Sequence, residues 1–173
     1  MFREEKHEVT GAELAKWLGK TAAIKSYSDV VRYGNIDEAL GPTQASAVIF
    51  PTSASMDNGH WIAIWIDHQN QTIQHFDSYG FSPQYEREFS SNQEVDDGDL
   101  NKMYQNAQAQ DGYRLVWNTI QFQSRANDVN TCGRHTAVRL LNRQLSNEQY
   151  ADMLRKEFPG MTFDEAVVKI TGG

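Results

Sequence analysis

The feature that most constrains the fold is the run His60–Asp67 (HWIAIWID), in which both sets of alternating side chains are apolar. In a β-strand the three isoleucines of this run would point to one face, and Trp61, Ala63 and Trp65 to the other. A strand with one face in water alternates apolar with polar residues, so a strand that is apolar on both faces belongs inside a covered sheet. The run therefore predicts a central strand.

Further strands are predicted around it. Ala47–Phe50 is a short apolar run that Pro51 stops, which is typical of a buried strand. Turn residues at 69–71 separate the central strand from Thr72–Ser78, so we expect these two segments to pair as a hairpin. The segment Tyr113–Phe122 (YRLVWNTIQF) indicates another strand.

Helices are predicted on both sides of these strands in the sequence. Three pairs of residues have capping-box spacing, namely Thr10 with Glu13, Ser146 with Gln149, and Thr162 with Glu165. A fourth helix begins near Cys132-Gly133, because apolar residues follow at helical spacing. Helices, then strands, then helices predict an α+β fold with a central, mostly antiparallel sheet packed by helices.

The 173 residues suit one domain spanning 1–173, with C-terminal helices in 146–170. The polar run Ser90–Leu100 is expected to be an exposed loop and is too short to separate two domains. A net charge of −7 argues against nucleic-acid binding. The charged N-terminus and the short apolar runs argue against secretion and membrane insertion. One cysteine excludes an intramolecular disulfide and fits a reducing compartment.

Cys132 is the first candidate for chemistry. A lone cysteine is often a small buried hydrophobic residue. Here, however, it follows a polar loop and opens a helix, with Gly133 beside it allowing close backbone approach. The N-terminus of a helix stabilises a thiolate and offers free N–H groups to an oxyanion. The position suits a nucleophile.

A thiolate nucleophile needs a base and a group that orients the base. Of the five histidines, His7 and His68 lie in charged or turn segments, and the ring of His135 would point away from the helix mouth. His60 opens the central strand, and the hairpin register would place Asp77 opposite positions 61–62, beside it. A carboxylate there would orient the imidazole. The alternative is that both are ordinary strand-end residues.

Metal binding is a rival use of these side chains. Cys132 and His135 have Cys-x-x-His spacing, but a closed zinc site needs four ligands, and the sequence has no second pair. We therefore predict no metal.

Together these segments resemble the adenovirus-type maturation proteases (adenain) and the ubiquitin-like-protein (SUMO) proteases, over about residues 10–145. Gly59-His60-Trp61 is similar to the family's His-Trp at the start of a central strand. Asp77 follows His60 by the family's seventeen positions, in a segment (FDSYGF) that resembles the acid-bearing segment of the viral branch. Cys132-Gly133 matches the nucleophile. The resemblance implies a papain-like cysteine protease, and we expect a viral or virophage member.

The resemblance also implies site roles. Cys132 would be the nucleophile, His60 the base and Asp77 its orienting acid. The family's glutamine donates to the oxyanion from six or seven positions before the cysteine, whereas Gln123 lies nine before it and Gln121 eleven. Gln123 is favoured, with the Cys132 backbone N–H as second donor and Trp61 as a further candidate. The substrate is expected beside Trp61, Gly59 and Gly133.

The family's substrates imply cleavage after Gly-Gly-like sites in polypeptides, either viral capsid precursors or ubiquitin-like modifiers. A catalytically silent binding module of the same fold is a further alternative. The ending Ile170-Thr171-Gly172-Gly173 fits such a site, so it is either a self-cleavage product or a chance ending. The adenovirus enzyme's disulfide-linked peptide and DNA are not expected here, because the only cysteine is the proposed nucleophile and the charge is negative. We expect no cofactor, a monomer, and a location in the virion or in the host cytoplasm or nucleus.

Overall fold

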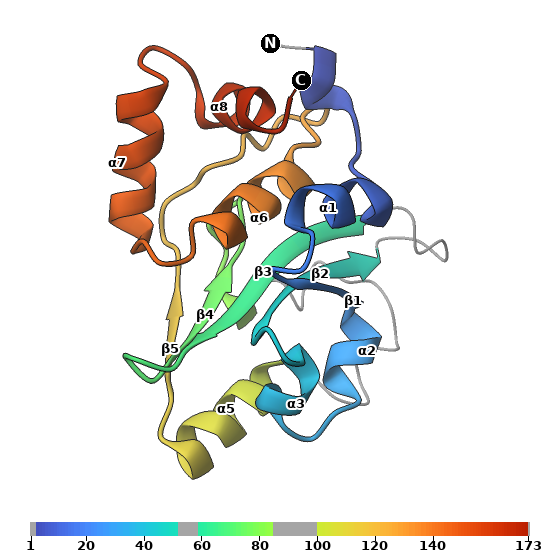
Figure 1. The fold of residues 1–173 in the computed structure, drawn as a ribbon, viewed down its shortest axis with the longest axis vertical. Helices are drawn as coiled ribbons and strands as arrows, with labels where there is room; N and C mark the ends of the chain where they lie inside the picture. The colour runs from blue at the N-terminus through green and yellow to red at the C-terminus, as the bar shows by residue number, and fades with distance from the viewer. Residues whose placement is uncertain (1–2, 52–58, 85–99, 173) are drawn as a thin grey trace.

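The computed structural model describes residues 3–51, 59–84 and 100–172 (Figure 1). Five strands form one sheet in the order β1-β2-β3-β4-β5. The two inner pairs, β2–β3 and β3–β4, are antiparallel, and the two edge pairs, β1–β2 and β4–β5, are parallel. The sheet is therefore less antiparallel than predicted. The strands span Ala23–Ser26, Ala45–Pro51, Gly59–Asp67, Thr72–Phe76 and Arg114–Trp117.

The prediction for the central strand is confirmed, because β3 lies in the middle of the sheet and is covered on both faces. Its isoleucines pack in one hydrophobic cluster with α2 (Tyr27–Val31), α3 (Ile36–Leu40) and α5 (Leu100–Asp111). Trp61, Ala63 and Trp65 pack in a second cluster with helices on the opposite face (Figure 1).

The helices of that opposite face are α1 (Gly11–Leu18), α6 (Cys132–Leu141), α7 (Asn147–Glu157) and α8 (Phe163–Ile170). All three predicted capping boxes form, at the starts of α1, α7 and α8. The short 3-10 helix η1 (Arg3–Lys6) contacts α8 at the same end of the molecule (Figure 1). In the described part of the chain, no helix is long and apolar enough to span a membrane.

Some predicted elements differ from the structure. The strand expected over Tyr113–Phe122 ends at Trp117, because the Asn118 side chain then takes over the hydrogen bonding, donating to the Asp77 carbonyl and accepting from the Asp77 N–H. The helix α5 was not predicted, and it begins at Leu100, the last residue of the predicted exposed loop. The rest of that loop lies outside the described residues.

Candidate active site

The hairpin of β3 and β4 brings His60 and Asp77 together. Phe76, the last residue of β4, pairs with Ala63, so Asp77 falls next to the first residues of β3 as the sequence predicts. The Nε2 atom of His60 lies 2.8 Å from Asp77 Oδ1. The carboxylate is fully buried, whereas the His60 side chain is 19% exposed. The imidazole is therefore held on one side and accessible on the other.

Cys132 is the third predicted residue at this site. It is the first residue of α6, which packs against β3, and it is a free cysteine that is partly exposed. It lies near enough to His60 to help raise the pKa of the imidazole. Its role as nucleophile stays a prediction.

The charges around His60 favour the protonated form of its imidazole. Burial lowers the pKa of His60, but the charge and hydrogen bond of Asp77, followed by the hydrogen bond and charge of Cys132, outweigh burial and raise the pKa to about 10. His60 therefore stays protonated at neutral pH, and a protonated imidazole can give its proton to a leaving amine.

The other histidines are engaged elsewhere. His7 and His68 are exposed, as expected, and contact Glu13 and Gln44. His75 is buried, its Nδ1 lies 2.8 Å from the Tyr104 hydroxyl, and burial lowers its pKa to about 4. Within the described ranges, no three His, Cys, Asp or Glu side chains are placed to hold a metal ion.

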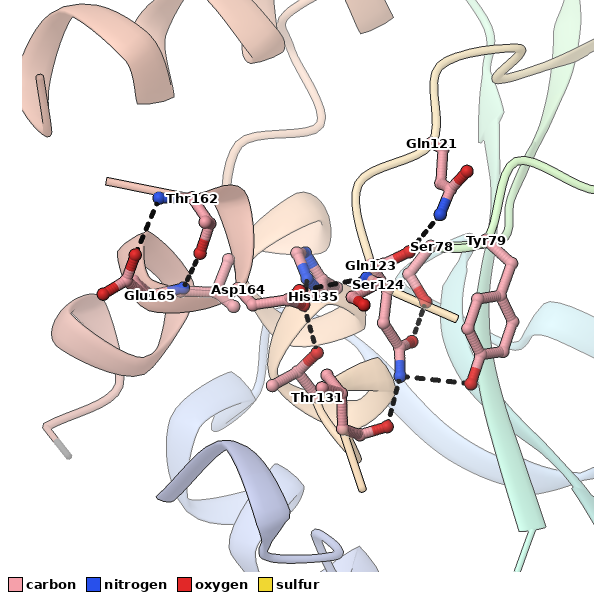
Figure 2. A network of polar contacts seen from close by, with 12 residues as sticks. Ser78, Tyr79, Gln121, Gln123, Ser124, Thr131, His135, Thr162, Asp164 and Glu165 are labelled. Carbon is pink, nitrogen blue, oxygen red and sulfur yellow. Dashed lines mark hydrogen bonds and ion pairs between the residues drawn. The ribbon is translucent and has the colours of Figure 1, made fainter. Parts of the chain in front are cut away.

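The remaining histidine, His135, lies on α6 one turn beyond Cys132 and forms a second buried pair. Its Nε2 atom is 2.9 Å from Asp164 Oδ1 on α8, and both side chains are buried (Figure 2). Asp164 also accepts hydrogen bonds from the Thr131 hydroxyl and the Ser124 N–H. Thr131 directly precedes Cys132, so α8 holds the segment that leads to the thiol.

The N-terminal segment holds the same approach loop from another side. The N–H of Asn130 donates to the Glu5 carbonyl at 2.6 Å, and its side-chain amide donates to the Lys6 carbonyl. The start of α6 is therefore fixed by residues far away at both ends of the sequence.

Gln123, the favoured oxyanion donor, lies near the site and is 1% exposed. Its Oε1 accepts from the Ser78 hydroxyl at 2.6 Å, and its Nε2 donates to the Val129 carbonyl at 3.1 Å and to the Tyr79 hydroxyl at 3.3 Å (Figure 2). Gln121 is exposed and donates to the Gln123 carbonyl. The oxyanion roles of the two glutamines and of the Cys132 N–H stay predictions.

Contacts within the protein explain the three residues that are expected beside the substrate, namely Trp61, Gly59 and Gly133. The Trp61 indole is buried and its N–H donates to the Val9 carbonyl at 3.1 Å. A Cβ at Gly133 would lie 2.7 Å from the Val9 Cβ, and one at Gly59 would lie 2.2 Å from the Phe50 carbonyl oxygen. Both glycines are therefore required for close packing. Contacts of these residues with substrate stay predictions.

Tyr79, two residues after Asp77, was not singled out from the sequence. Its ring stacks on the His60 imidazole, with centroids 4.9 Å apart and an interplanar angle of 17°. Its backbone N–H donates to the same Asp77 Oδ1 that accepts from His60. Its position in the acid-bearing segment was the only available signal, because stacking across a turn leaves no sequence pattern.

The fold is that of a viral protease. The structure is similar to the crystal structure of the selenomethionine ASFV pS273R protease, with a TM-score of 0.53 and 17% identity over 98% of this chain and 68% of that chain. This likeness confirms the predicted fold class, whereas a place in the adenovirus-type branch stays a prediction.

The chain belongs to the family of the uncharacterized protein V9 of Sputnik virophage. The two sequences are 30% identical over an alignment of 178 positions, gaps included. The alignment covers 96% of this chain and 95% of V9. No protein-family model matches the chain. The virophage relative agrees with the viral or virophage origin expected from the sequence.

Proposed function

We propose that this protein is a cysteine peptidase with Cys132 as nucleophile, His60 as general base and acid, and Asp77 as the group that orients and charges His60. The observation that carries the proposal is the 2.8 Å contact between buried Asp77 and His60, beside the partly exposed Cys132 at the start of α6. An imidazole held by a carboxylate and lying beside a thiol meets the requirements of a cysteine nucleophile.

The reaction follows from this arrangement. The Cys132 sulfur attacks the substrate carbonyl carbon, forming a C–S bond and a tetrahedral oxyanion, while His60 holds the thiol proton. His60 then passes that proton to the leaving amine as the C–N bond breaks. Water, deprotonated by His60, attacks the thioester and releases the acid product and the free thiol. Asp77 remains ionised and stabilises the imidazolium throughout.

The proposed substrate is a polypeptide with a Gly-Gly-like cleavage site, and the proposed role is maturation of viral capsid or precursor proteins. The virophage relative and the viral protease fold favour this role over cleavage of ubiquitin-like modifiers. The protein would then act in the virion or in the host cytoplasm or nucleus, as a monomer without a cofactor.

The test is hydrolysis of a fluorogenic Ile-Thr-Gly-Gly peptide by the wild type and by Cys132→Ala and His60→Ala. Both substitutions should lower kcat by about 10³-fold or more, since the residues of such a triad act as a unit. His68→Ala is the matched control, because His68 lies exposed at the β3–β4 turn, and it should leave the rate unchanged.

Alkylation of Cys132 by iodoacetamide at pH 6 provides a readout that needs no substrate. If His60 holds the thiol proton, the wild type reacts faster than His60→Ala, because the thiolate is the reactive form. Equal alkylation rates together with no turnover of any Gly-Gly substrate would overturn the proposal in favour of a binding module. Turnover of a ubiquitin-like fusion alone would move the substrate to the modifier class.

A further inference from the structure

Gln123 is the side chain expected to donate to the oxyanion, and every polar atom of its amide already has a partner. A glutamine amide has two hydrogens to donate. Both Gln123 hydrogens have acceptors inside the protein, the Val129 carbonyl and the Tyr79 hydroxyl, and the Gln123 oxygen accepts from Ser78. With its side chain also 1% exposed, Gln123 has no hydrogen left to offer a substrate in this arrangement.

Tyr79 is hydrogen-bonded to Gln123 (Figure 2), and its hydroxyl can supply the donor that Gln123 lacks. Its hydroxyl oxygen accepts from Gln123, and among the described residues no acceptor takes its hydroxyl proton. The side chain is partly exposed, and its ring lies on the His60 imidazole. Burial raises the pKa of Tyr79 to about 12, and the charge of Cys132 contributes to this rise. The hydroxyl therefore stays protonated, within electrostatic reach of the thiol.

The position of Tyr79 is fixed by the same groups that fix the base. Its N–H donates to Asp77 Oδ1 at 2.8 Å, and its carbonyl accepts from Arg125 Nη2 at 3.2 Å. The next residue, Gly80, has a φ of 79° and lies against the Ile120 carbonyl, 3.1 Å from where a Cβ would be. The turn after Asp77 is therefore tightly determined, as preorganised catalysis requires.

We propose that the Tyr79 hydroxyl is a catalytic hydrogen-bond donor to the oxyanion, acting with the Cys132 backbone N–H, and that Gln123 is a positioning residue for Tyr79. As the C–S bond forms, the carbonyl oxygen gains negative charge and accepts from the hydroxyl. When the C=O bond reforms, the hydrogen bond weakens and no proton is transferred. This inference rests on the proposed peptidase function and assigns a further residue to its site.

The test is Tyr79→Phe, which keeps the ring over His60 and removes only the donor. The expected result is a fall in kcat of about 10- to 1,000-fold with KM little changed, since loss of an oxyanion donor acts on the transition state. The rate of Cys132 alkylation at pH 6 should stay at the wild-type value, because His60 and its stack are retained. Tyr113→Phe is the matched control, since its hydroxyl contacts Asp37 away from the site, and it should leave kcat unchanged.

A second comparison separates Tyr79 from Gln123. If Gln123 acts through Tyr79, the double variant Tyr79→Phe/Gln123→Ala loses little more activity than the stronger single variant. Losses that multiply would mean that each side chain donates independently and would overturn the positioning role of Gln123. An active wild type with unchanged kcat in Tyr79→Phe overturns this inference alone. A wild type that is inert and alkylates no faster than His60→Ala overturns the peptidase proposal, and this inference with it.

Discussion

Two histidine–aspartate pairs lie near the start of α6, and their nitrogen–oxygen contacts are nearly the same length. The nitrogen–oxygen distance is 2.8 Å between His60 and Asp77 and 2.9 Å between His135 and Asp164. Their surroundings differ. The His60 side chain is 19% exposed and its pKa is influenced by Cys132, whereas the His135 side chain belongs to α6 and is 0% exposed.

A histidine–carboxylate pair therefore does not by itself define a catalytic base. Asp164 on α8 accepts from three donors in two segments, and so joins α8 to α6 and to the loop before Cys132. Asp77 instead binds a histidine that remains partly exposed. We propose that the first pair takes part in the chemistry, whereas the second holds the start of α6.

The largest expected difference is in turnover. Asp77→Ala should lower kcat/KM by about 100-fold or more, because the imidazole loses both its orientation and the charge that stabilises its protonated form. Asp164→Ala should lower it by less than about tenfold in the folded protein, since Asp164 touches neither His60 nor the thiol. Peptide hydrolysis by folded samples, checked by circular dichroism, measures both. Equal losses would mean that the second pair is part of the catalytic machinery.

For the free energy of unfolding the order should reverse. Asp164→Ala removes a buried acceptor from His135, Thr131 and Ser124, and such losses destabilise by about 3–5 kcal/mol. Asp77→Ala should destabilise less, because the partly exposed His60 can turn to water. Urea unfolding of both variants gives the comparison. A greater loss in Asp77→Ala would assign the structural role to the first pair.

The stabilisation that the two pairs contribute should be lost at opposite ends of the pH scale. The pKa of His60 is raised from 6.5 to about 10, so its stabilisation is complete below pH 6.5 and is lost as pH rises through 10. Burial raises the pKa of Asp164, but hydrogen bonds from His135, Thr131 and Ser124 outweigh this and lower it below 3.8. Its stabilisation is therefore present above pH 3.8 and is lost as pH falls through the lowered value.

Urea unfolding at a series of pH values tests this directly. The stability difference between wild type and His60→Ala should shrink from pH 6.5 to 10, whereas the difference between wild type and Asp164→Ala should be constant there and shrink only in acid. A His60→Ala difference that does not vary between pH 6.5 and 10 would show that the His60 pKa is not raised.

The smallest effect is expected at a third pair, on the surface. His7 Nε2 lies 2.9 Å from Glu13 Oε1, with side chains 52% and 35% exposed. Exposed pairs of this kind contribute about 0–1 kcal/mol, so His7→Ala should change the free energy of unfolding by less than about 0.5 kcal/mol. Glu13 is left intact because it also completes the capping box of α1. A larger change in urea unfolding would show that the N-terminal segment is coupled to the loop before Cys132.

Local signals in the sequence predicted much of the fold. The capping boxes placed α1, α7 and α8, because both partners lie within one helical turn. The alternation in His60–Asp67 predicted a covered central strand, and the structure packs both of its faces. The helix α5 was missed although Leu100, Met103, Tyr104 and Ala107 have helical spacing and are buried, because most of its other residues are polar.

Contacts between distant segments were the part that the sequence could not predict. The strand expected to reach Phe122 ends at Trp117, because the Asn118 side chain bonds the backbone of Asp77, 41 residues away. The Tyr79 stack on His60 and the full pairing of Gln123 likewise depend on where loops pack, and no periodic pattern records this.

The two histidine–aspartate pairs illustrate the difference between contacts that can be predicted from the sequence and contacts that cannot. The sequence alone determined that Asp77 meets His60, because a hairpin with a short turn converts a separation of seventeen residues into a fixed neighbour across the strands. The contact between Asp164 and His135 could be seen only in the tertiary structure, because it depends on how α8 packs on α6. Helix packing has no register that can be counted along the chain. Hydrogen-bond registers can be read from sequence spacing, whereas packing between helices follows from the shapes of the surfaces that the whole fold brings together.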